Sequence, residues 1–162
     1  MLRDKNLIPL SHQHQHALAL CVRIDRASPV AAADLDAWQG EIEQHFRGEI
    51  AIHFVAEERH MFPVARQYKE LIPLVDDLLQ DHAWLRDCFG KAEALALSSA
   101  ELSEFAQRLS AHIRKEERHL FEQLQGLMTE EDLTQLGRKL DEALKSATIA
   151  CALPAQTARK RK

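Results

Sequence analysis

A segment rich in histidine and glutamate occurs twice in the sequence. It reads HFVAEERHMFP at 53–63 and HIRKEERHLFE at 112–122, and most positions are identical, including both histidines and both glutamates. Each copy places a histidine four residues before a glutamate, as His53 before Glu57 and His112 before Glu116. On a helix this spacing brings the two side chains to one face, about 5–6 Å apart. Because imidazole and carboxylate groups both bind transition metals, the repeat predicts a metal site.

A second matching pair precedes the two copies. The pattern Leu-x-x-Gln-His at 10–14 corresponds to Leu-x-x-Asp-His at 78–82. The chain thus reads as two similar halves, and this symmetry suits two metal ions bridged by carboxylates. Histidine also occupies positions 12 and 16, but residues two apart point to nearly opposite sides of a helix. The apolar positions between 10 and 24 select His14 as the inward-facing histidine.

Helical periodicity and helix-breaking residues divide the chain into five helices. They are expected at 9–27, 34–62, 73–98, 100–125 and 129–147. Pro63 and Gly126 are expected to end the second and fourth helices, and Thr129 with Asp132 resembles a capping box. Short connections predict an all-α, antiparallel up-down-up-down four-helix bundle over 1–126. A short C-terminal helix over 127–148 and a basic, disordered tail over 149–162 are expected to follow.

Histidine interrupts the apolar seam of each of the four long helices. Leu, Ile and Phe otherwise recur there at alternating spacings of three and four, which is typical of a bundle core. A buried polar group without a hydrogen bond costs a few kcal/mol, and an unpaired carboxylate costs far more. The stability of a whole domain is only about 5–15 kcal/mol. A bound cation would satisfy imidazole and carboxylate together, and we therefore expect one.

Composition narrows the class of protein. The chain has 162 residues, a net charge of −4 and 28% charged residues, which favours one globular domain over a nucleic-acid-binding protein. The chain has 3 cysteines, an odd number, and no C-x-x-C motif, which indicates that the thiols are reduced. No signal peptide or membrane span is recognisable, so we expect a soluble, cytoplasmic protein without a membrane partner. Motifs of hydrolases and kinases are also missing, which favours a metal- or O2-binding protein over a dedicated enzyme.

The histidines and glutamates on four successive helices resemble the hemerythrin family, and in particular its HHE cation-binding branch. AEERHMFP and KEERHLFE resemble the signature of that branch on its second and fourth helices. The resemblance implies a non-haem di-iron site with bridging glutamates, terminal histidines and an oxo or hydroxo bridge, where manganese or zinc could substitute. It also implies a small partner such as O2, peroxide or NO, and a role in sensing, storage or detoxification. The implied metal ligands are His14, His53, Glu57, His82, His112 and Glu116, with His60, His119 and Glu117 as further candidates.

The sequence departs from the oxygen carriers of that family at three positions. Arg86 stands where those carriers have a second histidine on the third helix, and their fourth-helix carboxylate would correspond to Glu117. Gln13 replaces the acidic residue that usually precedes the first histidine, which predicts weaker support for His14. These departures favour metal binding over reversible O2 carriage.

Other functions compete with this interpretation. Glu57-x-x-His60 and Glu116-x-x-His119 fit the Glu-x-x-His pattern of ferritin-like proteins that oxidise or store iron. That architecture also needs a glutamate on each of the other two helices, and the first helix has none. Repair of iron clusters, or metal-dependent signalling through a partner, is a further alternative.

Overall fold

The computed structural model describes residues 2–151, and their regular structure is entirely helical. The described residues form five rods, each a single helix or an unbroken run of helical segments. The rods are α1 (Ile8–Ala27); α2 (Leu35–His45), η2 (Phe46–Ile50), α3 (Ala51–Ala56), η3 (Glu57–Met61) and α4 (Phe62–Ala65); α5 (Ile72–Glu93); α6 (Ser99–Lys115), η5 (Glu116–Leu120) and α7 (Phe121–Leu127); and α8 (Glu130–Cys151). The short 3-10 helices η1 (Ala32–Asp34) and η4 (Lys69–Leu71) precede the second and third rods.

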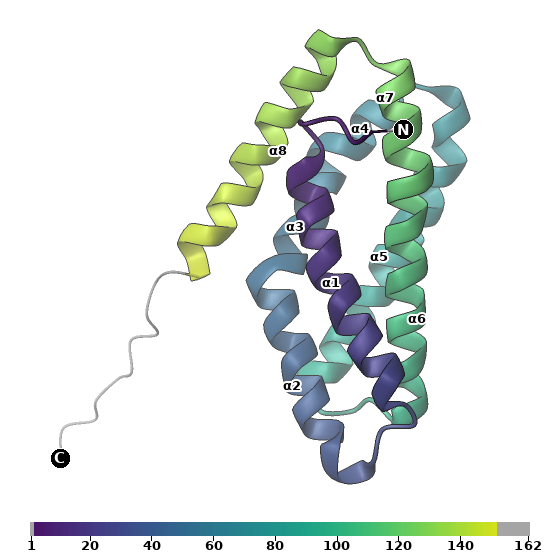
Figure 1. Ribbon diagram of the computed structural model, residues 1–162, viewed down its shortest axis with the longest axis vertical. Coiled ribbons are helices and arrows are strands. Elements are labelled where there is room, and N and C mark those ends of the chain that lie inside the picture. Colours follow the sequence, from purple (N-terminus) through teal and green to yellow (C-terminus); the bar gives the residue numbers. More distant parts are fainter. Residues whose placement is uncertain (1, 152–162) are drawn as a thin grey trace, which may run out of the picture.

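The first four rods lie beside one another (Figure 1). Contacts join α1 to α6, α2 to α5, α5 to α6, and α1 to η2. This arrangement is consistent with the expected four-helix bundle. None of the described helices is long and apolar enough to cross a membrane.

The second rod continues past Pro63, although the sequence predicted its end at Phe62. The turn η3 before the proline is a π-helix, in which the N–H of Phe62 bonds to the carbonyl of Glu57. Pro63 then falls in the first turn of α4, where a backbone N–H is not needed. The wider turn therefore lets the rod continue to Ala65.

The third rod ends at Glu93, five residues before the predicted stop at 98. Leu95 takes the left-handed conformation with a φ of 54°, and the N–H of Ala96 bonds back to the carbonyl of Lys91 at 2.8 Å. This backbone geometry closes a helix end in the manner of a Schellman motif. This helix end could not be predicted from the sequence, because the left-handed position of such a motif is usually glycine and here it is Leu95.

Side chains cap the starts of the fourth and fifth rods. Ser98 accepts from the N–H of Glu101, and the Glu101 carboxylate accepts from the N–H of Ser98, which completes a capping box. Thr129 accepts from the N–H of Asp132 at 3.2 Å, as the sequence predicted. Gly126 is not a helix stop, since α7 runs through it to Leu127.

Two separate apolar clusters form the core. The first core cluster includes Cys21, Phe89 and Phe105, and the second includes Leu10 and Phe121. Along α1, His14 lies between a residue of the second cluster and Ala17 of the first. The rods thus hold a buried polar layer between two apolar clusters.

The helix α8 has 22 residues, as many as α5, and extends four residues beyond the predicted end at Ala147. It packs against α3, η2 and η3, and its buried leucines, such as Leu136 and Leu140, belong to the second core cluster. Of the expected disordered tail over 149–162, positions 149–151 are part of α8, and the remainder lies outside the described residues.

Candidate metal centre

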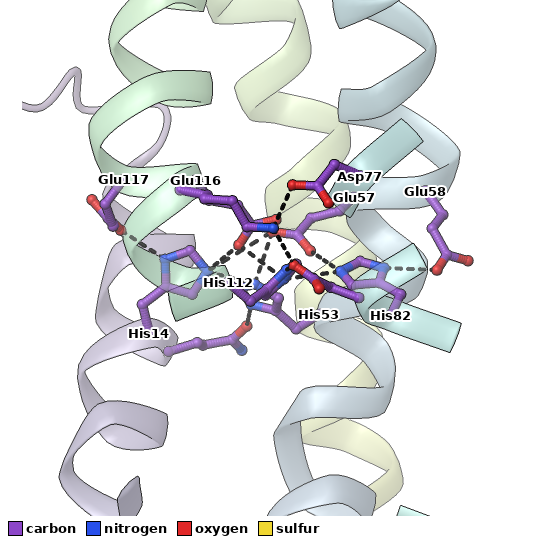
Figure 2. Close-up of polar contacts among 12 residues, drawn as sticks. His14, His53, Glu57, Glu58, Asp77, His82, His112, Glu116 and Glu117 are labelled. Atoms are coloured by element: carbon purple, nitrogen blue, oxygen red, sulfur yellow. Dashed lines mark hydrogen bonds and ion pairs between the residues drawn. The ribbon is translucent and has the colours of Figure 1, made fainter. Parts of the chain in front are cut away.

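Six buried side chains from four rods meet in the polar layer (Figure 2). They are His14 from α1, His53 from α3, Glu57 from η3, His82 from α5, His112 from α6 and Glu116 from η5. Glu57, His82 and Glu116 have no exposed surface. These are the six residues that the sequence put forward as metal ligands, and the fold brings all of them together.

The six residues form two groups of four, each of which could hold a metal ion. One group is His14, His53, Glu57 and Glu116, and the other is His82, His112, Glu57 and Glu116. Within each group the candidate ligand atoms all lie within 4.8 Å of one another. Because both groups contain both glutamates, the two positions share two carboxylates and have two histidines each.

The histidines face one another in pairs. The Nε2 atoms of His14 and His53 are 2.9 Å apart, and those of His82 and His112 are 3.2 Å apart. One ring can donate to the other only if its Nε2 carries a proton; when both rings hold the proton on Nδ1, two Nε2 lone pairs face each other and repel. A cation between the rings would satisfy both nitrogen atoms.

The outer nitrogen atoms face acceptors on neighbouring rods. His14 Nδ1 lies 2.7 Å from Glu117 Oε1, and His82 Nδ1 lies 2.8 Å from Glu58 Oε1. A carboxylate that accepts from Nδ1–H leaves the Nε2 lone pair free to bind a metal. The surroundings of the rings therefore favour the tautomer that a metal ligand needs.

The buried carboxylates are a direct test of whether a cation fits. All four carboxylate oxygen atoms of Glu57 and Glu116 are buried without a hydrogen-bond partner among the described residues. His53 Nε2 approaches Glu57 Oε1 at 2.9 Å, and His14 Nε2 approaches Glu116 Oε2 at 3.1 Å. These contacts are short enough for ion pairs but are not aligned as hydrogen bonds. Two such carboxylates would be costly to bury alone, and a cation shared with the imidazoles fits them well.

Electrostatic interactions in the polar layer favour the charged forms of both the imidazoles and the carboxylates. Burial lowers the pKa of His14, but the carboxylates of Glu116 and Glu117 outweigh this and raise the pKa to about 10. Burial likewise opposes charge on His82, yet Glu57 and Glu58 raise its pKa to about 9. Although burial alone would raise the pKa of Glu57, His53 and His82 hold it well below its usual range. A metal ligand binds through a deprotonated atom, so a bound cation would displace protons from these imidazoles.

A π-helical turn begins at each of the two glutamates. Glu57 begins η3 and Glu116 begins η5, at matching places of the sequence repeat. A π turn contains an extra residue, which rotates the subsequent residues by about 100° around the helix axis. Such turns are rare and often occur at functional sites. Regular α-helix was expected here, and neither turn was predicted.

This rotation moves two candidate ligands away from the centre. The pattern of spacings placed His60 and His119 on the seam, three residues after each glutamate. In the structure His119 is exposed, and His60 lines a surface pocket together with Lys139 of α8. Met61 and Leu120 are the fully buried residues instead. His60 and His119 therefore lie outside both groups.

Two glutamates next to the centre support its histidines. Glu117, the third additional candidate, lies outside both groups and contacts His14 and Arg3, the latter at 2.7 Å. Glu58 contacts His82 and is also bound by Arg86 at 2.6 Å. The guanidinium of Arg86 thus holds the carboxylate that orients His82. The second glutamate of each EERH segment, Glu58 or Glu117, is the feature of the sequence that could have indicated these contacts.

The support of His14 differs from the expectation. Gln13 does not contact His14; its Oε1 lies 2.8 Å from Nδ1 of His53. Side chains at adjacent positions of α1 point in different directions, so Gln13 reaches the neighbouring rod. The support of His14 comes from Glu117 and is not weakened by the substitution.

A small apolar cavity lies beside the centre. Its volume is about 20 Å³, and its walls come from α1, η2, α3 and α6, with Ala17, Ile50 and Leu109 among the lining residues. His14, His53 and His112 also line it. A cavity of this size holds about one water-sized molecule.

Comparison with known proteins gives one match. The family model of the hemerythrin HHE cation-binding domain matches residues 9–124, which include all six residues of the centre. Searches of curated proteins and of solved structures find no significant match.

Proposed function

Since the chain belongs to the hemerythrin family of HHE cation-binding domains, we propose that its buried centre binds two iron ions and a small oxidant. The observation that carries the proposal is the pair of four-residue groups that share Glu57 and Glu116. One ion would lie between His14 and His53, and the other between His82 and His112. Each glutamate would contribute to both positions.

The nature of the donor atoms favours iron. Six side chains with nitrogen or oxygen donors, two of them shared carboxylates, suit a pair of iron or manganese ions, whereas structural zinc prefers four ligands for one ion. When bound, the two ions would supply reversible redox chemistry, which the side chains of the layer lack. We further infer that the four rods form an antiparallel, up-down-up-down bundle, which lets each pair of neighbouring rods provide one pair of histidines.

The surroundings of the centre favour a small partner molecule. The cavity of about 20 Å³ beside His14 and His53 suits O2, NO or peroxide and is too small for an organic substrate. Its apolar side chains would admit an uncharged diatomic molecule and discourage bulk water. Oxygen or iron sensing, storage of such a ligand, and its detoxification are the roles that this arrangement supports.

The geometry favours this proposal over a ferritin-like one. A ferritin-like centre would use Glu57-x-x-His60 and Glu116-x-x-His119, but His60 and His119 lie outside both groups. The rods α1 and α5 contribute histidine, not glutamate, to the groups.

Metal analysis combined with visible spectroscopy tests the proposed function. Protein loaded with Fe2+ without oxygen, then desalted, is expected to contain about two irons per chain, one for each group of four ligands. Exposure to O2, followed by azide, should produce and then shift absorption bands of a ferric pair. A protein that holds a single zinc, or that holds no iron and remains folded, would reject the proposal.

A further inference from the structure

Each of the four central imidazoles turns its Nδ1 toward one side chain of a neighbouring rod (Figure 2). Three of these partners are carboxylates, and the fourth is an amide. The contacts are His14 with Glu117 at 2.7 Å, His82 with Glu58 at 2.8 Å, His112 with Asp81 at 3.4 Å, and His53 with Gln13 at 2.8 Å. The amide of Gln13 is therefore the exception.

Carboxylates and amides constrain a histidine differently. An ionised carboxylate can only accept, so it keeps the proton on Nδ1 and leaves Nε2 free for a metal. The amide of glutamine can either accept or donate, so it permits both tautomers of the ring. It also lacks the negative charge that makes a ligand more basic. Among the four, His53 is thus the histidine whose Nδ1 faces a partner without a negative charge.

Gln13 breaks an otherwise symmetric arrangement of the residues that face Nδ1 of the four histidines. Gln13 precedes His14 on α1 as Asp81 precedes His82 on α5, and each faces the histidine on the following rod of its own half. Asp81 is only 9% exposed, and Lys115 holds its carboxylate at 2.5 Å. The contact with Lys115 keeps Asp81 ionised, so its carboxylate faces His112 with a negative charge, although Nδ1 of His112 makes no hydrogen bond to it at 3.4 Å. Glu49, the acidic residue that lines the cavity near Gln13, pairs with His16 at the surface.

We propose that Gln13 makes the two metal positions unequal, so that the first divalent ion occupies the position of His82 and His112. This inference rests on the proposed two-ion centre. Two ions that share carboxylates repel each other, so stepwise binding alone would not reveal the inequality. The position that the first ion occupies does reveal which of the two metal positions binds more tightly.

Anomalous X-ray scattering from crystals grown with one equivalent of Mn2+ per chain locates that ion. We expect most of the manganese between His82 and His112, and a second equivalent to fill the position of His14 and His53. Equal occupancy, or preference for the position of His14 and His53, would overturn the inference while leaving the two-ion centre intact. Manganese at neither position would reject the centre itself.

A matched pair of substitutions tests the role of Gln13. Gln13→Glu supplies the missing carboxylate, whereas Gln15→Glu adds the same charge at an exposed position of α1. With Gln13→Glu we expect the first manganese to divide between the two positions and the second to bind about 10-fold more tightly, since such supporting contacts change metal affinity by about 10–100-fold. Gln15→Glu should keep the distribution of the original protein. An unchanged preference in Gln13→Glu, or the same change in both variants, would contradict the assignment.

Discussion

Replacement of His112 tests how much one side chain contributes to metal binding at the proposed centre. It belongs to the group with His82, Glu57 and Glu116, and only 1% of its surface is exposed. His112→Ala would leave that group with three ligands and a void beside the carboxylates. We expect bound iron to fall from about two ions per chain to about one or fewer, because the incomplete position holds metal poorly. Metal analysis after loading and desalting measures the change.

His12→Ala is the control for this substitution. His12 is exposed on α1, two residues from His14 and on the other side of the helix. Its removal should leave the iron content unchanged. Loss of iron in His12→Ala together with normal iron in His112→Ala would show that the assignment of inward-facing histidines is wrong.

The buried thiols of Cys21 and Cys88 belong to the first core cluster and lie away from the chemistry of the centre. Burial raises the pKa of both thiols to about 11. A raised thiol pKa disfavours the reactive thiolate, and at pH 8 a pKa of about 11 leaves about one thiol in a thousand ionised.

In a Cys151→Ser background, we therefore expect folded protein to take up no iodoacetamide at pH 8. The same protein in guanidinium chloride should take up two equivalents, one at Cys21 and one at Cys88, because unfolding restores the ordinary pKa and exposes both thiols. Intact mass spectrometry counts the adducts. An adduct on either residue in the folded protein would contradict the described burial.

At the scale of the elements, periodicity predicted the rods well and their local geometry poorly. Proline and the apolar seam located α1 to within one residue, and the seam selected His14 over its neighbours. The turns η3 and η5 could not be predicted because a π turn has no distinct composition. The misplacement of His60 and His119 is a direct consequence. An exact repeat of the EERH segment could have suggested a shared irregular geometry, but not its kind.

The end of α5 offers a prediction about backbone conformation. Leu95 has a φ of 54° and is 52% exposed, so its side chain contributes little packing to offset the strain. A left-handed conformation costs a residue other than glycine about 1–2 kcal/mol. Leu95→Gly should therefore raise the free energy of unfolding by about 1 kcal/mol and the melting temperature by about 2–4 °C. Urea and thermal denaturation measure both quantities.

Ala94→Gly is the neighbouring comparison, because Ala94 has a negative φ of −82°. Glycine relieves no strain there and only adds freedom to the unfolded chain, so this change should not stabilise the protein. If both glycine variants shift stability equally, the left-handed position of Leu95 is not the cause.

At the scale of the whole molecule, the centre depends on segments that are distant in sequence. Arg3 near the N-terminus contacts Glu117, and Glu117 contacts His14. Asn6 of the same N-terminal segment lies against Gly137 of α8. The sequence indicated α8 as a helix through its capping residues, but its docking could not be predicted, because the amphipathic pattern does not identify which rods receive its apolar face. Through the N-terminal segment, α8 is thus linked to one of the histidines.

Gly137 is the point where this docking can be tested. A Cβ atom at position 137 would lie 2.5 Å from Oδ1 and 2.6 Å from Cβ of Asn6, closer than atoms can approach. In most helices alanine is more stable than glycine by about 0.5–1 kcal/mol. Here the clash with Asn6 should reverse the sign, so we expect Gly137→Ala to lower the free energy of unfolding by about 1–3 kcal/mol.

Gly90→Ala is the matched control, because Gly90 is an exposed helical position of α5 where an added Cβ meets nothing within 4 Å. It should stabilise the protein by about 0.5–1 kcal/mol. Opposite signs for the two variants in urea denaturation would establish close packing of α8 on the N-terminal segment. Stabilisation by both would mean that α8 does not rest there, and the link from α8 through Arg3 and Glu117 to His14 would lose its basis.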